Sequence, residues 1–336
     1  MHKLFLSRAL ITAVQLRVPD LLQGTMTIEQ LATASSTVDS KLDRLMKYLA
    51  VEGVFDRVEA GVYRHNSLSE FMKSDHPRSV RPFIVFRAQI GAKAVTAWAD
   101  YIRGKANTPF NKAFHTDLGF WEYLCLPENA EMKKDFDGAM VANTRRIATS
   151  LVSTFPWKQY PDAHIVDVGG GMGQLLAHLL KAFPTYTGVV FDLPVTTESA
   201  GAYWKEHHAQ IASRASFVGG SFFESVPSGG DLYILKHIIH DWNDQECKQI
   251  LTKVAQALRQ TPSKRASILV IDRIYDFPPK HTTIADLDMM MMTLISGRER
   301  EMEEFKTLFE SAGLKLEEEV ELGTDATVMR VVLQDK

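Results

Sequence analysis

The sequence is poor in cysteine, with only Cys125 and Cys247 among its 336 residues. Two thiols are too few for a disulfide framework or a thiolate metal site, so we expect a reducing compartment and a cytoplasmic protein. The chain also lacks an apolar run long enough to cross a membrane. Its apolar N-terminus is interrupted by Arg8 and Gln15, which indicates an amphipathic helix rather than a signal peptide.

Positive charge is not in excess either, since the formal net charge is −3. This balance disfavours a nucleic-acid binder that relies on a broad basic surface. The overall composition, with 45% hydrophobic and 24% charged residues, is typical of a globular protein. At 336 residues the chain exceeds one ordinary core, so we expect more than one domain.

The first 75 residues predict a helix, a turn, a helix and a hairpin. Apolar positions at helical spacing occupy residues 4–22, Thr27 can cap a short second helix, and another helix is expected over about 39–52. Residues 58–64 predict a small hairpin, which completes the outline of a winged helix. Because acidic residues offset the basic ones on the helix that would read DNA, a dimerisation module is favoured over a DNA-binding regulator.

Residues 76–158 carry aromatic and methionine side chains at helical spacing, and prolines 156 and 161 mark a boundary after them. Such side chains usually form core. Those close to the following domain could instead line a substrate pocket, because methionines and flat aromatic rings accommodate planar ligands.

From residue 159 to 336 the pattern alternates between strands and helices, which predicts a doubly wound α/β fold with a mainly parallel sheet. The expected strands are 164–168, 188–191, 215–218, 231–235, 268–272 and 328–333.

A glycine cluster, Gly169-Gly170-Gly171-Met172-Gly173, follows the first of these strands and precedes an apolar-periodic segment. The spacing fits neither a dinucleotide fingerprint nor a phosphate-binding loop. An acid, Asp167, ends the strand, and a second acid, Asp192, ends the next one, at about the distance where a carboxylate holds a ribose diol. A ligand with a ribose and an amino-acid tail but no phosphate suits this set, so S-adenosylmethionine is the predicted cofactor.

The second informative stretch runs from Asp231 to Trp242 and passes the end of the fourth strand. Ligands of open α/β sheets bind outside the carboxyl ends of the strands, so His240 is expected in the same crevice as the glycine cluster. A histidine there is a plausible general base. His237 lies three residues away, but two histidines alone make a poor metal site, and we expect His237 to face the other way.

These stretches together resemble the small-molecule O-methyltransferases of the plant caffeate/flavonoid and microbial polyketide type. The resemblance covers nearly the whole chain and includes Val-Asp-Val-Gly-Gly-Gly-Met-Gly, Phe-Asp-Leu-Pro, Leu-Lys-x-x-x-His-Asp-Trp and Gly-Arg-Glu-Arg. It implies a Rossmann-like sheet of the class I methyltransferase kind behind a mostly helical winged-helix dimerisation domain. The implied domains are 1–75 for dimerisation, 76–158 as a helical region contributing to the pocket, and 159–336 for cofactor binding and catalysis. It further implies a homodimer formed through the N-terminal domain, a small-molecule substrate and no bound metal.

The resemblance also implies roles for particular residues. The general base falls on His240 and its partner carboxylates on Asp272 and Glu299. The implied cofactor-binding residues are Asp167, Gly169, Gly171, Asp192, Leu193, Ser221, Phe222, Lys236 and Trp242. Ser221 stands where the family usually has an acid that helps to hold the adenosyl group. The implied pocket residues are Phe120, Trp121, Phe136, Met140, Asp241, Met289 and Met292.

The expected activity is methyl transfer from S-adenosylmethionine to a hydroxyl of a small aromatic or polyketide-like molecule, with S-adenosylhomocysteine as the product. The alternative is a non-methylating isomerase, lyase or pericyclase of secondary metabolism that retains the cofactor. Retention of His240 favours methyl transfer.

Overall fold

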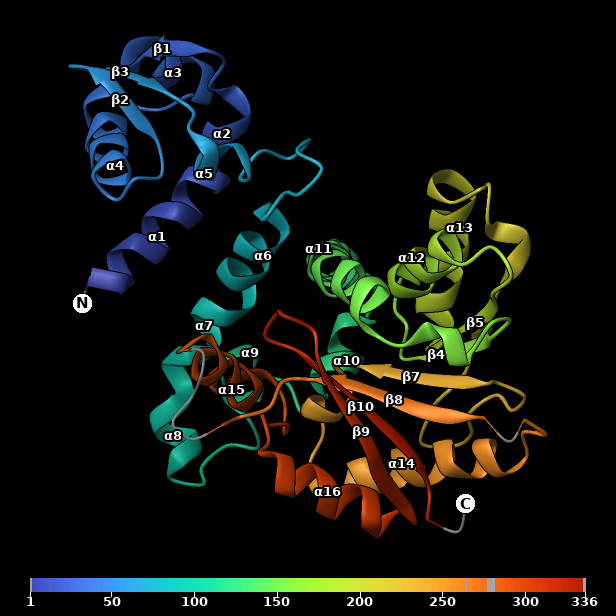
Figure 1. The fold of residues 1–336 in the computed structure, drawn as a ribbon. Helices are drawn as coiled ribbons and strands as arrows, with labels where there is room; N and C mark the ends of the chain where they lie inside the picture. Colours follow the sequence, from blue (N-terminus) through green and yellow to red (C-terminus); the bar gives the residue numbers. More distant parts are fainter. Residues whose placement is uncertain (1, 264, 277–281, 335–336) are drawn as a thin grey trace. The chain divides into compact units, whose positions relative to one another are not determined.

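The structure is a computed structural model and describes residues 2–263, 265–276 and 282–334 (Figure 1). It contains two compact units. The first comprises residues 1–93 and 127–142, and the second comprises residues 94–126 and 143–336. Residues 76–158 contribute to both units, and the long helix α11 (Ala130–Thr154) begins in the first and ends in the second.

The first unit begins with α1 (His2–Gln15), which stops before Arg17 because Arg17 has a left-handed backbone, with φ of 57°. Thr27 caps α3 (Ile28–Ser35) as expected, since its hydroxyl accepts from the amide of Gln30 and the Gln30 side chain accepts from the amide of Thr27. The remaining elements are α2 (Val18–Leu21), α4 (Asp39–Val51), β1 (Thr25–Thr27), β2 (Asp56–Glu59), β3 (Val62–Arg64), α5 (Ser67–Glu70), α6 (Arg81–Phe86), the π-helix η1 (Arg87–Gly91) and α7 (Ala92–Ala94).

The three short strands form an antiparallel sheet in the order β1-β3-β2. The hairpin and the two helices before it agree with the winged-helix outline; the sequence analysis did not predict β1. Buried apolar residues from α1, α3, α4 and the strand β3 form one core in this unit. Residues 4–22, with apolar positions at helical spacing, form two helices, α1 and α2, separated by the turn at Arg17.

The second unit is built on a seven-stranded sheet in the order β6-β5-β4-β7-β8-β10-β9. The first five strands are mutually parallel, whereas β10 pairs antiparallel with both β8 and β9. Its strands are β4 (His164–Val168), β5 (Thr187–Asp192), β6 (Ala215–Gly219), β7 (Leu232–Lys236), β8 (Ser267–Asp272), β9 (Leu314–Glu321) and β10 (Thr327–Leu333). The predicted doubly wound fold is confirmed, but β9 was not predicted.

One face of this sheet is covered by α11, α12 (Gln174–Ala182) and α13 (Pro194–His207), and the other by α14 (Asp244–Arg259) and α16 (Met302–Ser311) (Figure 1). The second unit also contains η2 (Val95–Ala97), α8 (Trp98–Ile102), α9 (Pro109–Phe114), α10 (Phe120–Leu124) and α15 (Thr282–Leu294). Alternate residues of each strand enter opposite cores: Ile165 packs with α11, α12 and α13, whereas Val166 packs with α14 and α16. Burial on both faces explains why the central strands are nearly continuous apolar runs.

The strand order reverses between β4 and β7, which are neighbours in the sheet. In open α/β sheets this switch point opens a crevice at the carboxyl ends of the strands. The turn after β4, the end of β5 and the turn after β7 therefore lie at the same edge of the sheet. Among the residues described, no helix combines the length and hydropathy needed to span a bilayer.

Candidate functional site

The turn after β4 depends on glycine in two different ways. Gly169, Gly171 and Gly173 all have positive φ, between 57° and 68°. A Cβ on Gly169 would collide with Ile238, and one on Gly173 would lie 2.7 Å from the indole nitrogen of Trp204. A Cβ on Gly171 would meet nothing within 4 Å. The backbone at Gly171 thus borders free space, where a ligand can approach it closely.

Two carboxylates flank this turn. Asp192 ends β5, and its Oδ2 accepts a hydrogen bond of 2.8 Å from the amide of Gly171. Its Oδ1 accepts one of 2.7 Å from the amide of Leu193. Asp167 is buried at the end of β4, and its Oδ2 has no hydrogen-bond partner among the residues described. Burial raises the pKa of Asp167 to about 7, although the charge of Lys236 opposes the rise.

An aromatic wall lies beside the turn, where a Cβ on Gly169 would be 3.7 Å from the ring of Phe222. The rings of Phe222 and Trp242 meet edge to face with centroids 5.8 Å apart, and Phe223 meets Trp242 at 4.8 Å. Ser221, which replaces the acid expected from the resemblance, accepts a hydrogen bond of 3.3 Å from the amide of Phe223. This wall is apolar and suits the face of a flat heteroaromatic ring.

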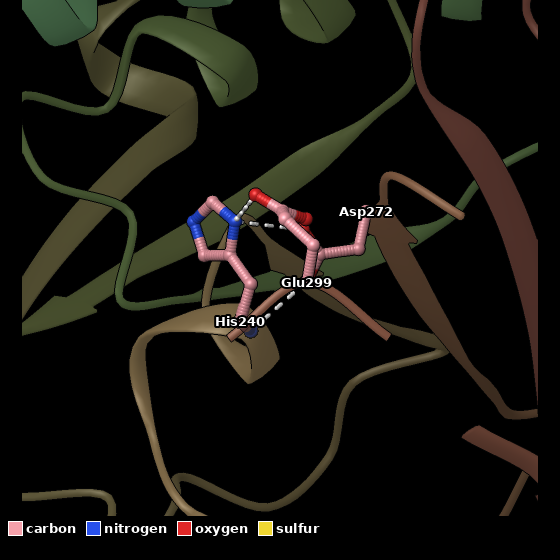
Figure 2. A group of neighbouring side chains, drawn as sticks. All are labelled: His240, Asp272 and Glu299. Carbon is pink, nitrogen blue, oxygen red and sulfur yellow. Dashed lines mark hydrogen bonds and ion pairs between the residues drawn. The ribbon is translucent and has the colours of Figure 1, made fainter. Parts of the chain in front are cut away.

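Three buried side chains meet beyond the end of β7 (Figure 2). His240 lies on the short 3-10 helix η6 (Ile239–Asp241), Asp272 is the last residue of β8, and Glu299 lies between α15 and α16. The Nδ1 atom of His240 is 3.0 Å from Oε1 of Glu299 and 3.4 Å from Oδ1 of Asp272. The amide of His240 also donates to Oδ2 of Asp272 over 3.3 Å. Both carboxylates therefore lie close to the same nitrogen of His240, Nδ1.

The carboxylates control the protonation of His240. Burial alone would lower its pKa, but the negative charges of Asp272, Asp241 and Glu299 outweigh burial and raise it to about 9. Asp241, a predicted pocket residue, lies with Oδ1 3.3 Å from Nε2 of His240. Burial raises the pKa of Asp241 to about 7. An imidazole so placed can take up a proton at Nε2 and hold it as a stabilised imidazolium.

Neighbouring residues fix the segment that carries the base. The guanidinium of Arg300 donates 2.7 Å hydrogen bonds to the carbonyls of Ile239 and Trp242, on either side of His240. A Cβ on Gly297 would collide with the carbonyl oxygen of His240. The amide of Glu299 donates to Asp288 on α15 over 2.9 Å. The roles of the two arginines and the glycine in the Gly-Arg-Glu-Arg segment were not predicted from the sequence.

The expectation that His237 faces away from His240 is wrong. The two imidazole rings are nearly parallel, with centroids 5.2 Å apart and 25° between their planes. His237 directly follows β7 and has φ of 56°. The left-handed residue turns the chain abruptly, so neither strand alternation nor helical spacing predicts where its side chain lies.

The predicted pocket residues are distributed over both compact units. Met289 and Met292 are half-buried on α15, and the indole nitrogen of Trp98 donates to Thr293 on the same helix over 2.8 Å. Phe120 and Trp121 lie on α10 with ring centroids 5.1 Å apart. Phe136 and Met140 lie on α11 in the first unit, where the Phe136 ring packs against Phe86. A shared pocket thus remains a prediction.

The three residues of Figure 2 also have the spacing of a metal-ligand set, because their donor atoms lie within 4.8 Å of one another. Occupation by a cation would consume Nδ1 of His240, the atom that now contacts both carboxylates. The expected absence of a metal remains a prediction that a chelator can test.

Comparison with known proteins defines the class to which this fold and site belong. Residues 96–315 match the O-methyltransferase domain, and residues 1–75 match the O-methyltransferase dimerisation domain. The chain belongs to the O-methyltransferase family of secondary metabolism. This membership confirms the predicted family, enzyme class and cofactor, S-adenosylmethionine.

Particular relatives cover nearly the whole chain. Phenazine O-methyltransferase PhzM of Lysobacter antibioticus is 30% identical over 316 residues, which are 93% of this chain and 88% of the relative. The structure of mitomycin 7-O-methyltransferase MmcR superimposes with a TM-score of 0.86 at 30% identity and covers 97% of this chain and 94% of its own. The O-methyltransferase NcsB1 from neocarzinostatin biosynthesis, solved with S-adenosylmethionine and 2-hydroxy-5-methyl naphthoic acid, has a TM-score of 0.81 at 27% identity and covers 98% and 96%.

Proposed function

We propose that the chain methylates a hydroxyl of a small aromatic or polyketide-like molecule with His240 as the general base. The observation that carries this proposal is the pair of carboxylates, Glu299 and Asp272, on Nδ1 of His240. They hold the ring with its Nδ1 proton directed at them, which leaves Nε2 to accept a proton.

The glycine turn fits the cofactor. Gly171 borders free space, and the buried Asp167 offers an oxygen with no hydrogen-bond partner among the residues described, which an ammonium group can satisfy. The carboxylate of Asp192 has about four acceptor positions and can serve ribose hydroxyls as well as the two backbone amides. Phe222 and Trp242 supply the apolar surface for the adenine.

S-adenosylmethionine, when bound, supplies a methyl group on a positively charged sulfur that an oxygen nucleophile can displace, leaving S-adenosylhomocysteine. The residues of this chain position the two substrates and remove the proton of the acceptor hydroxyl. A His240 pKa of about 9 lies close to the pKa of about 10 that a phenol such as tyrosine has. The proton can therefore pass from a phenol to Nε2 at little cost.

The relatives' names support an aromatic acceptor. Those relatives act on or bind a phenazine, a mitomycin and a naphthoic acid, as their names state. The adaptable methionines 289 and 292 on α15 are half-buried and suit a wall that receives flat molecules.

The test is methyl transfer by wild type and by His240→Gln across a panel of phenols and hydroxyquinones, followed by product mass. We expect the product to gain one methylene group, and turnover by His240→Gln to fall by roughly 10² to 10⁴ while S-adenosylhomocysteine affinity stays near wild type. His207→Gln, on an exposed histidine of α13, is the matched control. A product of unchanged mass would assign the chain to the non-methylating alternative, and activity lost to a chelator would assign the three donors to a metal.

A further inference from the structure

His237 occupies a position that the proposed reaction does not use. It has a left-handed backbone, which residues other than glycine seldom adopt, and its amide donates to the carbonyl of Ile271 on β8 over 2.9 Å. Its side chain is buried, and its ring lies 5.2 Å from that of His240 in a nearly parallel orientation. The two rings are therefore close enough for one small molecule to contact both.

One nitrogen of His237 already has a partner. Its Nδ1 lies 3.2 Å from Nδ2 of Asn143, so with the amide assigned this way Nδ1 accepts and the ring proton is on Nε2. Burial, followed by the charges of Lys236 and Arg273, lowers the pKa of His237 well below its usual value. The ring is therefore neutral and has a single N–H.

The second ring nitrogen of His237 has no hydrogen-bond partner among the residues described. Nε2 of His237 is buried and makes no hydrogen bond to any of the residues described. Buried donors in native proteins are nearly always paired, and an unpaired one is costly. A polar atom of the bound substrate is the natural acceptor, because the neighbouring ring is the proposed base.

We propose that His237 determines specificity: its Nε2–H donates a hydrogen bond to a carbonyl oxygen adjacent to the hydroxyl that is methylated. The preferred acceptors are then ortho-hydroxyaryl ketones and peri-hydroxyquinones. In such molecules the hydroxyl and carbonyl oxygens are about 2.6 Å apart, an ordinary hydrogen-bond separation, so two neighbouring imidazoles can each take one. This inference rests on the proposed function and narrows its substrate class.

The charges around the two rings are mixed: Lys236 and Arg273 lie near His237, whereas three acids surround His240. A carbonyl is favoured because of its effect on the reactivity of the neighbouring hydroxyl. In the free substrate the hydroxyl donates to its own carbonyl, which withholds the proton from a base. Donation from His237 to that carbonyl competes with this internal bond and releases the proton to His240.

The experiment compares matched acceptors: 2′-hydroxyacetophenone with 2-ethylphenol, and 1-hydroxyanthraquinone with 1-hydroxyanthracene. We expect wild type to favour the carbonyl member by roughly 10- to 100-fold in kcat/KM, because a site built for a hydrogen bond rejects the analogue that lacks it. His237→Phe removes the donor and should reduce this ratio to within a few fold of one. A general loss of activity in the variant lowers kcat/KM for both acceptors equally and therefore does not change the ratio between them.

Asn143→Leu is a second variant that leaves the backbone of His237 untouched. It frees Nδ1, so the ring can change tautomer, and the ratio should again fall. His207→Gln should keep the wild-type ratio. Equal methylation of both probes by wild type, or a ratio retained in both variants, would overturn the inference while leaving the proposed methyl transfer intact. Methylation of no hydroxyl in either series would instead refute the proposed function and, with it, this inference.

Discussion

At the scale of single residues, the two ring nitrogens of His240 face different groups. Nδ1 lies against Glu299 and Asp272, whereas Nε2 lies beside Asp241. With a pKa of about 9, the ring is mostly protonated at neutral pH. The resting site therefore holds its base in the charged form, and only the deprotonated fraction can accept a proton.

The pH dependence of activity follows from this state. A base must be neutral, so kcat/KM should rise with pH, about tenfold per unit, and level off near pH 9. Glu299→Gln removes one of the charges that raise the pKa of His240, so the midpoint should move to lower pH. The measurement is the pH profile of each variant with a substrate that does not itself titrate in this range. A midpoint that does not move would show that Glu299 does not act on the base.

A second residue-scale prediction concerns Asp192. Asp192→Ala should weaken binding of S-adenosylhomocysteine by roughly 10- to 100-fold, the worth of a hydrogen bond to a charged group. Isothermal calorimetry measures this directly. Asp162→Ala, at an acid whose side chain is 73% exposed, is the matched control. Equal affinity of Asp192→Ala and wild type would reject the ribose role.

The sequence placed some site residues better than others. His240 follows one predicted strand and Asp272 ends another, and parallel strands bring their carboxyl ends to one edge, so their proximity could be expected. His237 and Asp241 could not be placed, because the left-handed residue and the 3-10 turn after β7 break both the helical and the strand period. The contacts of Asn143 and Arg300 join residues distant in the sequence, which no local spacing indicates.

At the scale of elements, residues 297–300, between α15 and α16, hold η6 in position. Arg300 binds the carbonyls on either side of His240, and Gly297 packs against the carbonyl of His240 itself. The position of the base thus depends on a glycine that lies outside the glycine turn after β4.

Gly297→Ala tests this dependence. The added methyl group collides with backbone, which can move only by displacing η6, so we expect a loss of about 1 to 3 kcal/mol in the free energy of unfolding together with reduced kcat. Gly201→Ala on α13 is the control, because its Cβ meets nothing within 4 Å and alanine favours helix. Chemical denaturation and steady-state kinetics measure both effects. If Gly297→Ala keeps the stability and kcat of wild type, Gly297 does not help to hold η6 in position.

Among the elements, the central strands were predictable and β9 was not. β4, β7 and β8 are apolar runs because both of their faces are buried. β9 has the sequence Leu-Lys-Leu-Glu-Glu-Glu-Val-Glu and lies at the edge of the sheet, with alternate residues more exposed. Its acidic content disfavours a strand on propensity alone, and pairing with β10 overrides that preference.

At the scale of the whole molecule, residues 1–75 match a dimerisation domain, and we propose that the chain is a homodimer through this part. The side chains of Leu4 and Phe5 on α1 are about 60% exposed, although Ala13 and Val14 of the same helix are buried. Deleting residues 1–22 would therefore remove core as well as surface, so substitution is the better test.

The double variant Leu4→Glu/Phe5→Glu should be a folded monomer, because it places charge on an apolar surface without altering the core. Sedimentation of wild type and variant at micromolar concentration is the measurement, with circular dichroism to confirm folding. Ile102→Glu, at an exposed apolar residue of the second unit, should leave the assembly unchanged. A monomeric wild type would refute the homodimer.

The strand order also determines when the sheet can be completed while the chain is being synthesised. β10 occupies residues 327–333 yet lies inside the sheet, between β8 and β9. Until residues 327–333 have been synthesised, β8 has an open edge, which can pair with another nascent chain. A product terminated before residue 327 lacks β10 and therefore exposes the edge of β8, which should make it prone to aggregation.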